Sequence, residues 1–169
     1  LRTKDIPILI HCDLGNDKDL TKYYKLITSL FDHYPNNKII WAHFGGICKE
    51  LTKILPLQHT NILTEIFEKY KNVYIDLSWD IVHKIIIDED LEPYPDIYTN
   101  LLNKYSTRFL SGTDFLGTIG KTYKHYSNGV DSTSDLYKDL NDKSYQNIVL
   151  GGNYIKLFNL KQYKVPKLY

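Results

Sequence analysis

The chain has 169 residues and a formal net charge of +1, with 43% hydrophobic and 24% charged residues. This composition is ordinary for a globular domain, and it gives no sign of a nucleic-acid or membrane partner. No apolar run approaches the length of a membrane span. We expect one domain over residues 1–169, with a loose tail over residues 161–169.

Two features of the composition bear on the origin of the chain. Its two cysteines, Cys12 and Cys48, are too few for a disulfide framework at this size, so we expect a reducing compartment, the cytoplasm. The sequence contains no methionine and begins with Leu1. We therefore expect a processed chain or a part of a longer protein.

Four short apolar runs predict buried strands. They start afresh roughly every 30 to 35 residues, and each is followed by residues with helical periodicity. This alternation is typical of βαβ units, which form a parallel sheet with right-handed crossovers. The predicted strands cover residues 6–11, 38–43, 73–78 and 108–111.

The segments between the strands show helical stripes and helix-ending residues. Asn16 is a plausible N-cap for the first helix, which ends near residue 33. Pro56 is expected to end a short helix that follows Gly45-Gly46, and Asn153 to cap the last helix. The other predicted helices begin near residues 60, 95, 134 and 144, and loops are expected over residues 79–93 and 115–130.

Three predicted strands end in a histidine or an aspartate. His11 ends the first strand, His43 ends the second, and Asp114 follows shortly after the fourth. The carboxyl ends of parallel strands meet at one edge of a sheet, as they do in the active sites of α/β barrels. On an extended segment, Asp13 would also point to the same side as His11, whereas Cys12 would point toward the packing layer.

Imidazole and carboxylate side chains together suggest a divalent metal site. Both are ligands of Zn²⁺, Mn²⁺ or Fe²⁺. Such an ion lowers the pKa of a bound water, and a nearby carboxylate can take its proton. Each residue alone also has an ordinary structural interpretation, as a strand-end histidine bonded to a carbonyl or as a turn aspartate.

Five segments in order resemble landmarks of the amidohydrolase superfamily. The group that they most resemble is the amidohydrolase-related branch that includes aminocarboxymuconate semialdehyde decarboxylase. The likeness extends over essentially the whole chain and would match strands five to eight of a (β/α)₈ TIM-type barrel. The segments are Ile8-Leu9-Ile10-His11 and residues 42–46, 73–78, 111–115 and 152–158.

The resemblance implies a metal-dependent hydrolase or a nonoxidative decarboxylase acting on a small-molecule substrate. His11 would be a metal ligand, and Asp114 both a ligand and the proton acceptor. His43 would contact the substrate or bind the metal, whereas Asp76 and Ser78 would be mainly structural. The expected metal is zinc, with Mn or Fe as alternatives. The family's His-x-His pair on strand one is absent, so we expect the other half of the barrel elsewhere, or self-association.

The sequence also fits other interpretations. The chain could be a noncatalytic remnant or interaction domain, or a flavodoxin-like open sheet that binds an anion. Residues 117–122 resemble a phosphate loop only weakly, because Phe115 stands where its first glycine belongs. Cys12 is expected to be a buried structural thiol. The remaining histidines are expected at the surface, namely His33, His59, His83 and His125.

Overall fold

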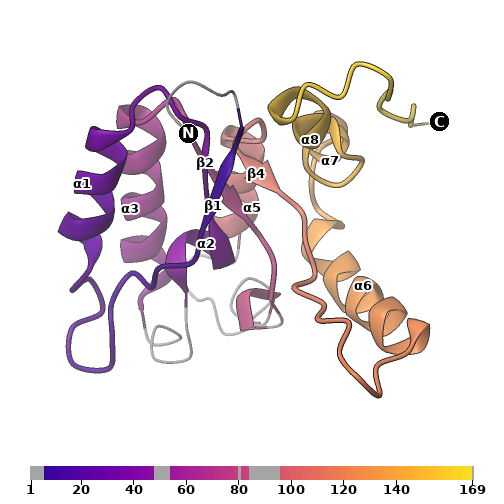
Figure 1. Cartoon of the computed structure of the whole chain (residues 1–169), viewed down its shortest axis with the longest axis horizontal. Coiled ribbons are helices and arrows are strands. Elements are labelled where there is room, and N and C mark those ends of the chain that lie inside the picture. Colours follow the sequence, from indigo (N-terminus) through magenta and orange to yellow (C-terminus); the bar gives the residue numbers. More distant parts are fainter. Residues whose placement is uncertain (1–5, 48–53, 80, 84–95, 169) are drawn as a thin grey trace.

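The computed structural model describes residues 6–47, 54–79, 81–83 and 96–168 (Figure 1). Its strands are β1 (Ile8–Ile10), β2 (Ile39–Trp41), β3 (Val73–Asp76) and β4 (Phe109–Leu110). Its longer helices are α1 (Tyr24–His33), α3 (Pro56–Lys69), α5 (Ile97–Lys104) and α6 (Tyr123–Tyr137). Three shorter ones are α2 (Ala42–Gly46), α7 (Asp142–Ile148) and α8 (Gly152–Leu157).

The four strands form one parallel sheet in the order β1-β2-β3-β4. Each predicted strand is therefore present, and the predicted α/β alternation is confirmed. Neighbours in the sheet are also neighbours along the chain, so the described strands lack the reversal of order that characterises a doubly wound sheet. This order disfavours the flavodoxin-like alternative, and it brings the carboxyl ends of all four strands to one edge.

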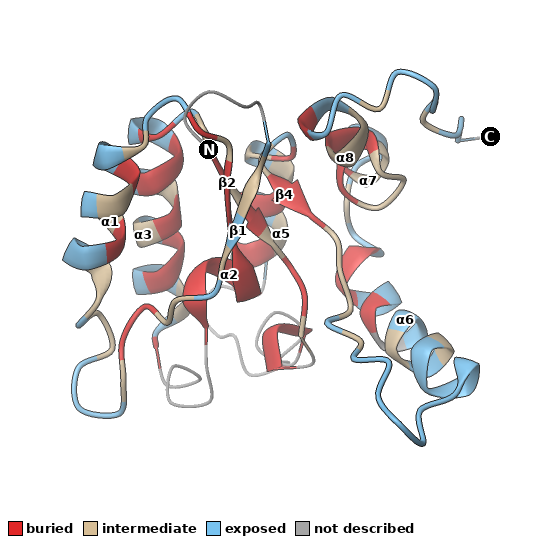
Figure 2. Ribbon diagram, viewed as in Figure 1, coloured by how far each residue is buried: buried red, intermediate tan, exposed pale blue. Residues whose placement is uncertain are grey.

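The main core lies on one face of the sheet, beneath α1, α3 and α5 (Figures 1 and 2). Alternate residues of the strands point into it, because side chains alternate between the two faces of a strand. Trp41, Ile75 and Phe109 occupy one register level and are fully buried. They pack in one cluster with helix residues such as Phe31 and Phe67.

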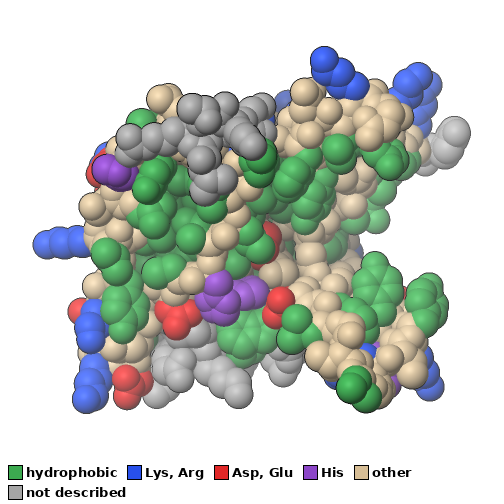
Figure 3. All heavy atoms as spheres, viewed as in Figure 1, with side chains coloured by type: hydrophobic (Ala, Val, Ile, Leu, Met, Phe, Trp, Pro, Cys, Tyr) green, Lys and Arg blue, Asp and Glu red, His purple; other side chains and the backbone are tan. Residues whose placement is uncertain are grey.

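The opposite face of the sheet is covered only in part. Ile40 and Leu110 are buried against Leu157 of α8, and Lys38 Nζ donates a hydrogen bond to the Leu157 carbonyl at 3.1 Å. On the edge strand β1, Leu9 leaves 62% of its surface exposed. Hydrophobic side chains are accordingly visible over the face of the molecule shown in Figure 3, with histidine side chains at its lower centre.

Several predicted helix boundaries are wrong. Asn16 does not cap α1; its side chain accepts hydrogen bonds from the backbone N–H groups of Lys18 and Asp19 and closes a local turn, so the helix begins only at Tyr24. Pro56 begins α3 instead of ending a helix, a position where its missing N–H costs nothing. The short helix expected before it falls mainly on residues 48–53, and Pro95 also lies outside the described residues.

Two boundaries near the C-terminus differ as well. The expected loop over residues 115–130 contains the first half of α6, which begins after a capping box formed by Thr122 and His125, well before the helix start predicted near residue 134. Asn153 lies inside α8, and its amide donates to the carbonyls of Ser106 and Phe109, both at 2.7 Å. Asn153 therefore fastens α8 beneath β4 and does not cap it.

Candidate functional site

The ends of β1 and β2 bring two histidines into contact. Ile10 pairs with Trp41, so the residues that follow these two leave the sheet side by side. The His11 and His43 ring centroids lie 4.7 Å apart, with the rings nearly perpendicular at 82°. The predicted meeting of the two imidazoles at one edge of the sheet is confirmed.

His43 stands in an unusual backbone turn. His43, Phe44 and Gly45 all have positive φ values, of 56°, 52° and 79°. Left-handed conformation is costly for residues other than glycine, so a run of this kind persists only where surrounding contacts hold it. It turns the chain sharply after β2 and buries His43, which is 6% exposed.

Contacts from the end of β1 hold this turn in place. The Trp41 indole Nε1 donates to the Cys12 carbonyl at 2.7 Å, and the Leu14 N–H donates to the Gly46 carbonyl at 2.9 Å. A Cβ atom on Gly46 would lie 2.3 Å from the Cys12 carbonyl oxygen. Only glycine fits where the two chain segments cross.

A buried histidine, His59 of α3, supports the turn from below. Its Nε2 donates to the Phe44 carbonyl at 3.0 Å, and its ring packs edge-on against the Phe44 ring. Burial lowers the pKa of His59 to about 4, so the ring is neutral at neutral pH. The expectation that His59 and His83 lie at the surface is wrong, because they are 0% and 5% exposed.

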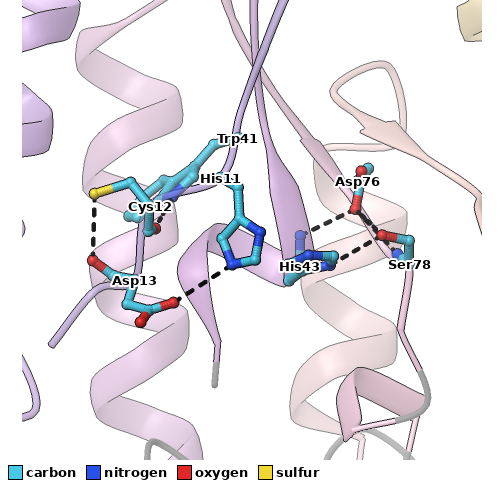
Figure 4. A network of polar contacts seen from close by, with 7 residues as sticks. All are labelled: His11, Cys12, Asp13, Trp41, His43, Asp76 and Ser78. Carbon is cyan, nitrogen blue, oxygen red and sulfur yellow. Dashed lines mark hydrogen bonds and ion pairs between the residues drawn. The ribbon is translucent and has the colours of Figure 1, made fainter. Parts of the chain in front are cut away.

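A hydrogen-bond network orients His43 from β3 (Figure 4). Asp76 Oδ1 accepts from the His43 backbone N–H at 3.0 Å and from the Ser78 hydroxyl at 2.7 Å. Since the only hydroxyl proton of Ser78 points to Asp76, the contact of 3.1 Å between Ser78 Oγ and His43 Nδ1 requires a proton on Nδ1. This assigns the Nδ1–H tautomer and leaves Nε2 as the basic nitrogen of His43.

His11 is held much more loosely. Its side chain is 65% exposed, and its Nε2 lies 3.8 Å from Asp13 Oδ1. That contact agrees with the expectation that His11 and Asp13 point to the same side. Cys12 is partly buried and packs against the main core, as expected for a structural thiol, and burial raises its pKa.

Asp114, the third predicted site residue, lies four positions beyond the end of β4, exposed and with a positive φ of 54°. Among the described residues, no group of three or more His, Cys, Asp or Glu side chains is placed so that it could hold a metal ion. The structure thus joins His11 and His43 but does not gather Asp114 with them into a metal-holding cluster. The described residues therefore supply two neighbouring imidazoles for a divalent ion, but no third ligand beside them.

The residues missed by sequence reasoning are those that hold the turn. His59 shares the helical stripe of Leu63, Ile66 and Phe67, and that spacing could have placed it in the core. The paired roles of Asp76 and Ser78 depend on a left-handed turn that no local pattern indicated.

The topology defines an α/β protein with a parallel sheet of consecutive strands. Comparison with protein-family models, with curated proteins and with solved structures finds no match for this chain. None of the helices in the described ranges has both the length and the apolar character needed to cross a bilayer.

Proposed function

We propose that this chain carries part of the active site of a metal-dependent hydrolase or nonoxidative decarboxylase of the amidohydrolase type. The observation that supports the proposal is the contact between His11 and His43 at the ends of adjacent parallel strands. Imidazole pairs at such an edge suit a divalent ion, zinc by preference.

The proposed roles follow from how each side chain is held. His11 is free to turn toward a ligand, whereas His43 offers only Nε2, because Nδ1 is committed to Ser78. A hydrogen bond to the second ring nitrogen is what commonly fixes a metal-binding or substrate-polarising imidazole. The metal, when bound, would supply a water of lowered pKa, and Asp114 would act as ligand and proton acceptor.

We further propose that the sheet is half of a (β/α)₈ barrel and is completed by other strands. β1 and β4 are the edges of the described sheet, and an unpaired strand edge invites pairing with a further strand. The face of the sheet opposite the main core is also partly open, since Leu9 of β1 is 62% exposed, and Ile6 just before β1 is 51% exposed. The completing half would come from a separate segment or from a second copy, and would bring the remaining ligands. Light scattering coupled to size-exclusion chromatography tests self-association directly.

Calorimetric titration of the chain with ZnCl₂ tests the metal site. Removal of one of two or three ligands should weaken zinc binding about tenfold or more in His11→Ala, His43→Ala and Asp114→Asn. His33→Gln is the matched control, because His33 is exposed at the end of α1. Unchanged zinc affinity in both histidine variants would contradict the proposal.

A second candidate function is a noncatalytic interaction domain that retains the sheet without a metal site. The exposed apolar side chains of Ile6 and Leu9 favour it, since they suit a protein partner as well as a missing strand. Folded protein that gives no zinc-dependent heat, together with a concentration-dependent increase in mass, would favour this second function.

A further inference from the structure

A cavity of about 430 Å³ lies between the chain that follows β4 and the helices α6 and α7. This volume is in the range of small-molecule sites. The cavity adjoins the candidate site, because Gly112 lines it and a Cβ atom there would lie 3.1 Å from Ser78 Cβ. Most of its lining side chains carry hydroxyl groups, among them Ser111, Thr133, Ser134, Tyr126, Tyr137 and Tyr145.

Three of these hydroxyls have already used their protons. Ser111 Oγ donates to the Ile148 carbonyl at 3.0 Å. Thr133 Oγ1 and Ser134 Oγ donate to carbonyls one helical turn earlier, each at 2.7 Å. Towards a ligand these three oxygens can therefore act only as hydrogen-bond acceptors. A ligand that satisfies them must carry several donors.

Apart from Gly112 and Thr113, the remaining lining is aromatic and aliphatic. Tyr126, Tyr137 and Tyr145 contribute rings, and Val130 and Val149 contribute methyl groups. Tyr137 is only 4% exposed, and burial raises the pKa of its phenol, so this side chain is uncharged. None of the described residues that line the cavity is charged, so an ionic ligand would find no counter-ion there.

We propose that this cavity binds a small uncharged polyol of about the size of a monosaccharide. Its hydroxyl groups would donate to the oxygens of Ser111, Thr133 and Ser134, and its C–H faces would pack on the tyrosine rings. This binding goes beyond the proposed metal chemistry and requires no metal, so each proposal can fail without the other.

Ligand-observed NMR titration of the full chain, without metal, tests the assignment. The probe is methyl β-D-glucopyranoside, and its per-O-methylated form keeps the ring but removes every donor. Saturable binding of the first, and binding at least about fivefold weaker for the second, is expected from the loss of several hydrogen bonds. Cyclohexylamine and gluconate serve as cationic and anionic probes and should bind more weakly than the glucoside.

Two variants connect the binding to the cavity. Thr133→Val removes one acceptor at nearly constant volume and should weaken glucoside binding about three- to tenfold. Thr60→Val is the matched control, because Thr60 is equally buried in α3, donates to the Pro56 carbonyl in the same way, and lies outside the cavity. Val130→Trp fills the rim of the cavity from a position that is 39% exposed, and should abolish binding while the circular dichroism spectrum stays unchanged.

The opposite results overturn the assignment. For the wild-type chain, these results are no saturable binding of the glucoside, equal binding of the per-O-methylated sugar, or tighter binding of either charged probe. For the variants, the contradicting result is equal glucoside affinity of the Thr133→Val and Thr60→Val proteins.

Discussion

The ends of β1 and β2 carry the same residue type in very different surroundings. His43 after β2 is almost fully buried and is fixed by Asp76 and Ser78. His11 after β1 is mostly exposed and has one ion-pair contact of 3.8 Å with Asp13. The rings nevertheless touch. The fold therefore fixes the orientation of His43, whereas the exposed side chain of His11 can still move toward a ligand.

The contrast follows from the position of the two strands in the sheet. β2 has a neighbour on each side, so the residues at its carboxyl end donate hydrogen bonds to Asp76 of β3 and to the Cys12 carbonyl after β1. β1 is an edge strand among the described residues, so no further described strand lies on its open side to hold His11. The side chain after a strand is thus held firmly only where neighbouring strands provide hydrogen-bond partners for it.

The largest effect is expected where the two strand ends cross. Gly46→Ala would place a Cβ atom 2.3 Å from the Cys12 carbonyl oxygen, at a φ of 76°. We expect the free energy of unfolding to fall by roughly 3 kcal/mol or more, measured by urea denaturation. Gly129→Ala in α6 is the control, because a Cβ atom there meets nothing within 4 Å, and it should stabilise by about 0.5–1 kcal/mol. Equal stability of the two variants would show that the crossing is not tight.

The next effect concerns the support beneath the β2 turn. His59 has a pKa of about 4 in the fold, against an ordinary value of 6.5. As the pH falls, the unfolded chain is protonated first, so stability is complete above about pH 6.5 and is lost toward pH 4, by on the order of 3 kcal/mol. Urea denaturation at pH 7 and pH 4.5 should detect most of this loss.

The matched variant for the acid effect is His59→Gln. Its side-chain amide can still donate to the Phe44 carbonyl but does not titrate in this range. The difference in unfolding free energy between the two pH values should therefore shrink by roughly 2–3 kcal/mol relative to the wild type. An unchanged pH dependence would rule out His59 as its source.

A smaller effect is expected from the network that holds His43. Ser78→Ala removes the acceptor of the Nδ1 proton and should cost roughly 1–2 kcal/mol of stability. The sharper measurement is the ¹⁵N chemical shift of the His43 ring, which should change from the Nδ1–H pattern toward the Nε2–H pattern. Ser29→Ala, an exposed change in α1, is the control. A wild-type ring that is already Nε2–H would contradict the assigned tautomer.

The smallest change in stability is expected at His11, the loosely held histidine after β1. His11→Ala should alter the free energy of unfolding by no more than about 0.5 kcal/mol, because the side chain is largely exposed. His43→Ala, in the same denaturation series, should cost roughly 2 kcal/mol, because it leaves a cavity and removes the partner of Ser78. Similar costs for the two variants would remove the distinction between a fixed and a free histidine.

Sequence reasoning predicted the strands and the meeting of His11 with His43, because both depend on apolar runs and on the geometry of parallel strands. It placed the start of α6 near residue 134, about eleven residues too late, because the first half of this helix is mostly exposed and its start depends on the capping box of Thr122 and His125. It also missed the role of His59, which only a contact with the distant Phe44 carbonyl defines. Contacts between residues far apart in the sequence, such as that of His59 with Phe44, could not be predicted from local sequence patterns.

The buried position of His59 also affects how acid sensitivity of this protein is interpreted. His59 lies behind the turn and touches Phe44, not the ring of His43. Protonation of His59 in acid places a charge in a fully buried site and adds an Nδ1–H that has no acceptor among the described residues, so it destabilises the turn that holds His43. If the proposed zinc site exists, a loss of zinc binding in weak acid would then reflect destabilisation of this turn, and the midpoint of that loss would belong to His59, which lies outside the imidazole pair.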